Sequence, residues 1–213
     1  MRASEILALA RRAGIAPGVS VLDLCCGVAG PGRLIARELG CDYLGVDASP
    51  GAIAIARERA AGLPCRFEVQ RIPPVPSGTF DVVLLLETML AFRDKATLLG
   101  GVADALAAGG RFAFTLEEGR PLDASERAAM PDSDTVWLTP LDELLGHLDD
   151  AGLTVRWQED VSAAHRAVAD ALIEAFTAHA PEAAARLITG HRLWSAWLHA
   201  GRARKFAFVA EKR

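Results

Sequence analysis

The alternation of apolar runs with helical patterns is the feature that most constrains how this chain folds. Strands that alternate with helices form parallel sheets covered by helices on both faces. The apolar runs predict strands at 19–24, 41–47, 65–70, 80–88, 111–118, 153–161 and 202–212. The helical patterns lie between most of them, at 31–40, 49–62, 95–110 and 140–152. We therefore predict an α/β fold: a doubly wound, mostly parallel sheet of about seven strands.

Two segments interrupt this alternation. Residues 120–139 form a polar, proline-containing connection, and connections of this length often act as lids or binding loops. Residues 162–200 contain no strand pattern and predict two helices, the second opened by Pro181. We expect both segments to form a helical cap on a single domain that spans residues 1–213.

The composition limits the partners of the chain. The formal net charge is −4, and no basic stripe with interleaved aromatic residues occurs, so we expect no nucleic-acid partner. No apolar run approaches the ~20 residues of a bilayer span, and the N-terminal segment lacks the apolar core of a signal peptide. The four cysteines provide neither paired zinc ligands nor a secreted disulfide framework. These observations predict a soluble, cytoplasmic protein without a membrane partner, and they predict no particular oligomeric state.

Three chemistries compete for the segment VLDLCCGVAGPG, a strand that runs into a turn of small residues. Its two adjacent cysteines suit neither a mutual disulfide nor metal ligation, so we interpret them as small side chains in a tight turn. A loose glycine pattern, with Asp47 twenty residues beyond Gly27, fits dinucleotide binding. Asp23 opposes that interpretation, because a carboxylate beside the turn repels a pyrophosphate.

The third chemistry makes use of Asp23. S-adenosylmethionine carries an ammonium and a sulfonium, and an acidic residue beside small residues suits such a cation, directly or by ordering the loop. Asp47, at the end of the second strand, can accept hydrogen bonds from both ribose hydroxyls. The segments DLCCGVAG, YLGVDASPGAIAIARERA, GTFDVVLLLETML and ALAAGGRFAFTLEE follow one another in the chain. Together they resemble the class I S-adenosylmethionine-dependent methyltransferases, particularly bacterial members that act on small molecules.

The resemblance implies a Rossmann-like fold whose last strand inserts antiparallel, and it implies a set of cofactor residues. Asp23, Cys25 and Gly27 would line the methionine end of S-adenosylmethionine. Asp47 would bind the ribose, with Ala48 beside the adenine.

The chain also departs from the family pattern. Cys25 and Ala29 replace glycines, so we expect the loop to avoid left-handed backbone angles at these two positions. Many relatives carry an acid after the third strand, where this chain reads VQRIPP. We therefore expect backbone groups near Arg71 and Ile72 to hold the adenine, with Ile72 packed on the ring.

Candidate catalytic residues are harder to derive. Methyl transfer from a sulfonium is an in-line displacement that proximity and desolvation can drive, so a general base is optional. Glu87 and Thr88 end the fourth strand and, by the resemblance, would face the cofactor and its methyl group. Glu87 would be a base or an anchor for a substrate amine, or it would bind loop amides beside the cofactor. His191 and His165 in the predicted cap are candidate bases, because an imidazole titrates near neutrality; surface or packing roles are the alternative.

The remaining candidates concern the substrate site. Trp137 in the long connection and Trp194 in the cap would form apolar or cation-attracting walls, with core packing as the alternative for Trp194. Glu117 and Glu118 end the fifth strand at the same edge and are expected to be a solvated pair; the alternative is that one of them faces the pocket while strand alternation directs the other away. The basic run RARK at 202–205 is expected to be a solvated strand start. No metal site is predicted.

Together these features predict methyl transfer from S-adenosylmethionine to an oxygen, nitrogen or carbon of a small organic molecule. Two alternatives stay open: a non-catalytic S-adenosylmethionine-binding protein and a nicotinamide-dependent oxidoreductase. The second is the weaker, because the only tyrosine, Tyr43, lies within a predicted strand and no tyrosine–lysine pattern is evident.

Overall fold

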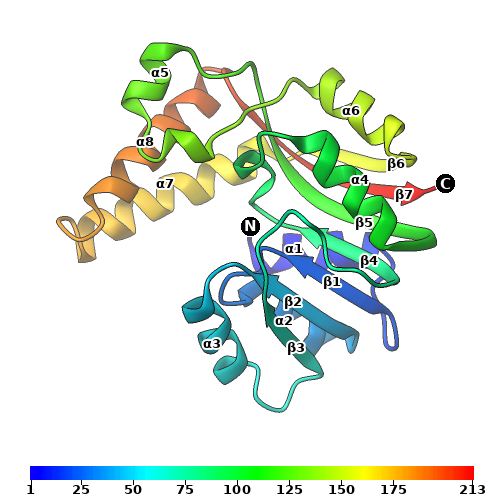
Figure 1. Ribbon diagram of the computed structural model, residues 1–213. Coiled ribbons are helices and arrows are strands. Elements are labelled where there is room, and N and C mark those ends of the chain that lie inside the picture. The colour runs from blue at the N-terminus through cyan, green and yellow to red at the C-terminus, as the bar shows by residue number, and fades with distance from the viewer.

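The computed structural model describes residues 1–213 and contains one mixed sheet of seven strands (Figure 1). The strands are β1 (Ser20–Leu24), β2 (Asp42–Asp47), β3 (Cys65–Val69), β4 (Phe80–Leu85), β5 (Leu106–Glu118), β6 (Leu153–Asp160) and β7 (Arg204–Lys212). Their order is β3-β2-β1-β4-β5-β7-β6, and only β7 runs antiparallel to its neighbours. The predicted fold class and the antiparallel last strand are confirmed.

The helices cover both faces of this sheet and one of its ends. They are α1 (Ala3–Arg12), α2 (Gly30–Leu39), α3 (Pro50–Arg59), α4 (Lys95–Ala105), α5 (Ala124–Ala129), α6 (Leu141–Asp150), α7 (Ser162–His179) and α8 (Ala185–His199), with 3-10 turns η1 (Met89–Ala91) and η2 (Ser133–Thr135). Local sequence explains where several begin. Ser49 Oγ accepts the Ala52 amide at 3.2 Å ahead of α3, and an Asp94 oxygen accepts the Thr97 amide at 2.9 Å ahead of α4.

The apolar strands are buried because helices pack on both of their faces. On one face, α4 and α6 pack on the sheet around Phe112, Phe114 and Phe208. On the other face, α1, α2 and α3 pack around Tyr43 and Phe67. Double coverage explains why the central strands read as continuous apolar runs rather than as alternating ones.

Three predicted boundaries were wrong. Helix α8 begins at Ala185, after a turn at 181–184, rather than at Pro181. Strand β4 ends at Leu85 rather than at residue 88, because Glu87 has a left-handed backbone with φ 64°. Helix α4 ends at Ala105 rather than at residue 110, and β5 begins at the next residue. The glycines at 109 and 110 therefore lie within the strand, where Gly109 has φ 70°.

The predicted cap segments, 120–139 and 162–200, contain α5, η2, α7 and α8, which gather at one end of the sheet (Figure 1). Since α5 follows β5 and α7 follows β6, this end is the carboxyl edge of those parallel strands. Ligands bind at that edge in open α/β sheets. None of the helices combines the length and the apolar character that crossing a bilayer requires.

Candidate functional site

The loop after β1 is organised from beneath by a buried carboxyl group. Asp23 is 3% exposed, and its Oδ2 accepts a hydrogen bond from Tyr43 Oη at 2.5 Å. Gly32 leaves the space for this hydroxyl, since a Cβ at that position would lie 2.0 Å from it. Burial raises the pKa of Asp23 to about 7, against the opposing effect of the Tyr43 hydrogen bond. The carboxyl group therefore supports the loop from below rather than lining an open surface.

The turn itself has a strained backbone. Cys25 has φ 58° and Ala29 has φ 54°, so the expectation that both avoid left-handed angles was wrong. A non-glycine residue in this region costs ~1–2 kcal/mol, and such strain concentrates at binding and catalytic loops. The Cys25 thiol lies beside Thr88, and burial raises the pKa of Cys25 to about 12, so the thiol stays protonated.

Asp47 joins this turn to the loop after β2. Its Oδ2 accepts the Gly27 amide at 2.9 Å, and its Oδ1 accepts the Ser49 amide at 2.8 Å. Each oxygen keeps a second lone pair, so the carboxylate can still accept hydrogen bonds from a diol. Ala48 is exposed beside it. A Cβ added to Gly27 would meet nothing within 4 Å, so the turn borders open space.

The segment after β3 lies next to Asp47, because the Gln70 amide donates to the Asp47 carbonyl at 2.9 Å. Arg71 is exposed, and Ile72 is half-buried against the core. The predicted cofactor residues Cys25, Gly27, Asp47, Ala48, Arg71 and Ile72 thus lie along one edge of the sheet, at the ends of β1, β2 and β3.

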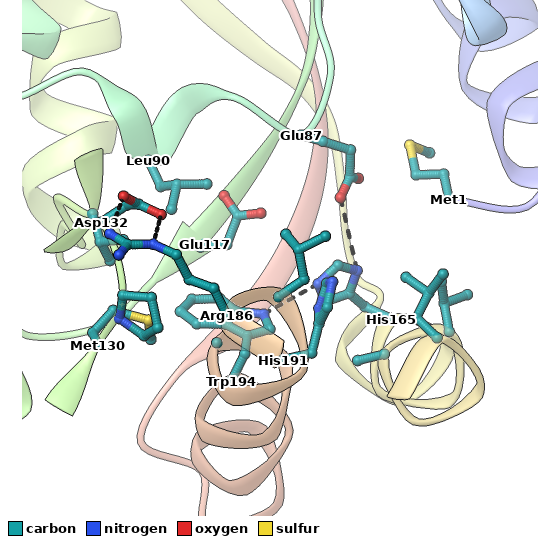
Figure 2. Close-up of a pocket in the computed structure, with 17 residues that line it drawn as sticks. Met1, Glu87, Leu90, Glu117, Met130, Asp132, His165, Arg186, His191 and Trp194 are labelled. Atoms are coloured by element: carbon teal, nitrogen blue, oxygen red, sulfur yellow. Dashed lines mark hydrogen bonds and ion pairs between the residues drawn. The ribbon is translucent and has the colours of Figure 1, made fainter. Parts of the chain in front are cut away.

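A cavity of about 390 Å³ lies next to this edge, between the end of β4 and the cap (Figure 2). Four predicted residues line it: Glu87, His165, His191 and Trp194. Its other walls are largely apolar and include Leu90, Met130, Val136, Val168, Leu172 and Leu187.

Two predicted substrate residues do not line this cavity. Thr88 turns toward the cofactor loop, where it contacts Cys25, and its hydroxyl donates to the Leu86 carbonyl at 3.2 Å. The Trp137 ring contacts the guanidinium groups of Arg93 and Arg127, at 5.0 and 4.4 Å from its centroid. The Trp137 indole therefore packs between Arg127 of α5 and Arg93 of the loop after η1, and it does not line the cavity.

Glu87 occupies the inner end of the cavity together with Glu117, for which the pocket was the alternative prediction, and Lys205, which was not predicted to lie there. Lys205 Nζ donates to Glu87 Oε2 at 3.1 Å and also to Glu117 Oε1. Lys205 is 1% exposed and Glu117 is 3% exposed, so the expected solvated strand start and solvated acidic pair were wrong at these two positions. Glu117 and Lys205 are direct partners across β5 and β7. The opposite charges on the two strands were the available signal in the sequence. The pairing could be inferred from them only once the antiparallel register of β5 and β7 was known.

The electrostatics of this group favour its charged form. Burial is the largest single influence on Glu87 and opposes its ionisation, yet the charges of Lys205, the Met1 α-amino group and His165 and the Lys205 hydrogen bond together lower the pKa of that carboxyl group. Burial likewise opposes the charge on Lys205, and the two carboxylates nevertheless raise its pKa. One oxygen of each carboxylate, Glu87 Oε1 and Glu117 Oε2, is buried without a hydrogen-bond partner.

His165 is held in one tautomer by Trp194. The indole Nε1–H can only donate, and it lies 3.2 Å from His165 Nε2, so that nitrogen must be the unprotonated one (Figure 2). The proton is then on Nδ1, which lies 3.9 Å from Glu87 Oε2. Burial and the Lys205 charge lower the pKa of His165 to about 4, so the ring is neutral near pH 7. In this state neither ring nitrogen has a free lone pair.

His191 differs from His165 because its ring nitrogens make no hydrogen bond to the protein. Its ring stacks on Phe176 with centroids 6.1 Å apart, and it faces the cavity. Burial lowers the pKa of His191, which favours the neutral imidazole. Of the two predicted bases, His191 is therefore the one whose lone pair remains free.

Comparison with known proteins relates this geometry to a family. Residues 21–110, which contain the cofactor edge, match the family described as a methyltransferase domain. Phosphoethanolamine N-methyltransferase 3 of Arabidopsis thaliana is 36% identical over 103 residues, which cover 46% of this chain and 21% of the plant protein. Methyltransferase GfsG of Streptomyces halstedii is 27% identical over 186 residues, which cover 79% of this chain and 64% of that protein. The chain thus spans about a fifth of the length of the plant relative.

A solved structure extends the likeness to the whole fold. The crystal structure of a putative sarcosine dimethylglycine methyltransferase from Galdieria sulphuraria superposes with a TM-score of 0.84 at 17% identity. The alignment covers 99% of this chain and 84% of that one. Because its sequence relatives include proteins of Arabidopsis thaliana and of Streptomyces halstedii, the bacterial type predicted from the sequence stays a prediction.

Proposed function

We propose that this chain, which carries a class I S-adenosylmethionine-dependent methyltransferase domain, transfers a methyl group from S-adenosylmethionine to an O, N or C nucleophile of a small organic molecule. The observation that carries the proposal is the turn after β4. Thr88 contacts Cys25 in the cofactor loop, while the adjacent Glu87 lines the cavity. A cofactor edge and an acceptor cavity that meet at one turn provide the proximity that a displacement needs.

The residues present fit S-adenosylmethionine. The turn at Gly27 borders open space, so a ligand can approach its backbone closely. Cys25 and Gly27 would hold the methionine end, and Asp23 would act from below through the loop. Asp47 would accept the ribose hydroxyls with its spare lone pairs. Backbone groups near Ala48, Arg71 and Ile72 would hold the adenine.

Bound S-adenosylmethionine supplies a methyl group activated by its sulfonium. The chain's own residues then hold the acceptor in line and exclude water, which the apolar cavity walls favour. For a hydroxyl or amine nucleophile, His191 is the group with a free lone pair that can take the proton. His165 would position Trp194 and the cap instead of accepting a proton, because its Nε2 is engaged.

The sheet also bears on the oxidoreductase alternative. The dinucleotide-binding sheet has the strand order 3-2-1-4-5-6, whereas here an extra strand, β7, inserts antiparallel between β5 and β6. Tyr43, the only tyrosine, is buried with its hydroxyl engaged by Asp23. A non-catalytic S-adenosylmethionine-binding protein is the outcome in which the cofactor binds and no methyl group is transferred.

We place the chain in the cytoplasm, with a small-molecule partner and no nucleic-acid partner. The acidic net charge and the free state of all four cysteines support this proposal.

Asp47→Ala is the first test of the cofactor site. We expect calorimetry to show affinity for S-adenosylmethionine and S-adenosylhomocysteine reduced by more than tenfold, because the variant loses the ribose acceptor and frees the Gly27 amide. Asp42→Ala, at the other end of β2 and exposed, is the matched control and should bind as the wild type does. Unchanged affinity in Asp47→Ala removes Asp47 from the site. Tight binding of NAD alone overturns the proposed function.

Activity is tested with a panel of small alcohols, phenols, amines and carbon acids and with methyl-labelled S-adenosylmethionine. Transfer of label to any of them, lost in Asp47→Ala, is the expected result. Cofactor binding without transfer to any acceptor supports the non-catalytic alternative.

A further inference from the structure

The inner end of the cavity presents two hydrogen-bond acceptors that the protein does not satisfy. Glu87 Oε1 and Glu117 Oε2 are both buried without a partner, and both residues line the cavity. The Glu117 side chain is only 4% exposed, so bulk water does not readily donate a hydrogen bond to it. Buried acceptors without a donor are unfavourable and rare. The pair therefore indicates a ligand that donates hydrogen bonds at this point.

The local charge indicates that this ligand is a cation. Two carboxylates face one ammonium here, and Lys205 reaches one oxygen of each. The Met1 α-amino group acts on Glu87 through space but makes no ion pair with either carboxylate. At the rim, Asp132 and Arg186 neutralise each other at 3.0 Å (Figure 2). Met1 lines the same cavity and its charge offsets part of the charge of Glu87, but neither Lys205 nor Met1 donates a hydrogen bond to the free oxygens of Glu87 and Glu117.

A divalent metal fits this place less well than an organic cation. Glu87, Glu117 and His165 each offer an atom within 4.8 Å of the others, which is the spacing of a metal site. However, the Trp194 indole occupies His165 Nε2 and thereby puts the proton on Nδ1, so the ring cannot ligate. Lys205 already holds the space between the two carboxylates with a positive charge.

An ammonium group supplies the donors that these two acceptors lack. It carries three N–H donors, whereas Glu87 Oε1 and Glu117 Oε2 each lack one. Beyond them the walls are apolar, with Leu90, Val168 and Trp194 among them.

We propose that the methyl acceptor carries a protonated amine on an apolar body, and that this ammonium group donates hydrogen bonds to the free oxygens of Glu87 and Glu117. The proposal rests on the methyl-transfer function proposed above and names the acceptor class of the same site. It concerns recognition, so no bond is made or broken between the ammonium group and the carboxylates.

The test compares amines with matched alcohols. A panel of primary alkyl- and arylalkylamines, each paired with the alcohol of the same skeleton, is titrated into the protein saturated with S-adenosylhomocysteine. We expect the best amines to bind at least tenfold more tightly than their alcohols. Glu117→Gln should abolish that preference while binding S-adenosylhomocysteine normally, because Glu117 does not contact the cofactor edge. Glu118→Gln is the matched control: Glu118 pairs with Arg204 at 2.8 Å and does not line the cavity.

Each outcome bears on the proposal. Amines and alcohols that bind equally, or a panel that does not bind to protein saturated with S-adenosylhomocysteine, overturn it and leave the methyl-transfer function standing. Binding of Mg²⁺, Mn²⁺ or Zn²⁺ that is lost in Glu117→Gln and excludes the amines overturns it in favour of a metal site. A protein that binds neither S-adenosylmethionine nor S-adenosylhomocysteine refutes the proposed function itself. If Glu117→Gln does not fold, Glu87→Gln replaces it, with circular dichroism and thermal unfolding as the check on folding.

Discussion

At the scale of single residues, the site depends on backbone conformations that residue type does not predict. Cys25, Ala29 and Glu87 all have left-handed φ angles although none is glycine. Residue type alone argues against such angles, so the expectation for the loop failed at Cys25 and Ala29. The strain is retained because contacts hold each residue in place, as the Thr115 hydroxyl does by accepting the Glu87 amide at 2.8 Å. Asp47, by contrast, was predictable from its place at the end of a strand.

Gly27 allows backbone strain and ligand access to be separated. Its φ is 55°, and a Cβ there would meet no protein atom within 4 Å. We expect Gly27→Ala to lower the free energy of unfolding by only ~1–2 kcal/mol, the cost of a left-handed alanine. Its methyl group would nevertheless enter the space assigned to the cofactor. Affinity for S-adenosylhomocysteine, measured by calorimetry, should fall by at least tenfold.

Gly62→Ala is the matched control for this substitution. Gly62 has φ 83° and equally open surroundings, but it follows α3 on the surface, away from the turn. A similar loss of stability with unchanged affinity is expected. If the two variants bind S-adenosylhomocysteine equally well, the cofactor does not approach the protein at Gly27.

At the scale of elements, apolar runs were sufficient to predict the central strands, because helices cover both of their faces, and the last strand was predicted from its alternation. They could not predict the pairing of Glu117 with Lys205, which lie 88 residues apart. That contact depends on the antiparallel register of β5 and β7, and alternation within either strand does not fix a register. From sequence alone, a short charged run at the end of a strand is predicted to be solvated, and its burial can be recognised only when the partner strand is known.

Lys205→Met tests what this cross-strand pair contributes. Removing one partner of a buried ion pair costs ~3–5 kcal/mol, because the other charges stay buried. With Lys205 present, the lowered pKa of Glu87 contributes stability above its unfolded pKa, and this is lost as the pH falls through the folded value. In Lys205→Met, burial is expected to raise the pKa of Glu87, so the variant loses stability as the pH rises. The destabilisation should therefore be small near about pH 4 and largest above about pH 7.

Urea unfolding of wild type and variant across this pH range measures the difference. Lys212→Met on the same strand is the control, because Lys212 donates only to the Leu106 carbonyl at 2.8 Å. A destabilisation by Lys205→Met that does not change with pH would show that the lost contacts are packing contacts.

At the scale of the whole molecule, the sheet has a large hydrophobic core on each face, and the cap has a much smaller one. The cofactor edge is supported by the core on one face of the sheet, around Tyr43, and the strands bearing it are buried. The cap instead has a satellite cluster of its own, formed by Leu122, Met130, Val136, Leu138 and Ala203. The acceptor cavity lies between these two parts, so access to it depends on the part with the smaller core.

This division predicts unequal opening free energies. In α7 only Ala169 is buried, and in α8 only Ile188, Ser195 and Leu198 are. Regions with few buried contacts open locally at lower free energy than the core. In amide hydrogen exchange we expect α7 and α8 to have protection factors at least tenfold lower than β1 and β4, a difference of ~1.4 kcal/mol or more.

Ligands should change this exchange pattern in two separate places. S-adenosylhomocysteine is expected to slow exchange in the loops after β1 and β2, because it contacts the Gly27 and Asp47 region and not the cap. An amine from the panel, added to that complex, should then slow exchange in α7 and α8, which form one side of the acceptor cavity. Equal protection of the cap and the sheet before any ligand is added would instead mean that the molecule opens as one cooperative unit. In that case a ligand would enter the cavity through movement of side chains at its rim alone. The rim side chains that would have to move are Leu172 and Leu187, which are 36% and 55% exposed.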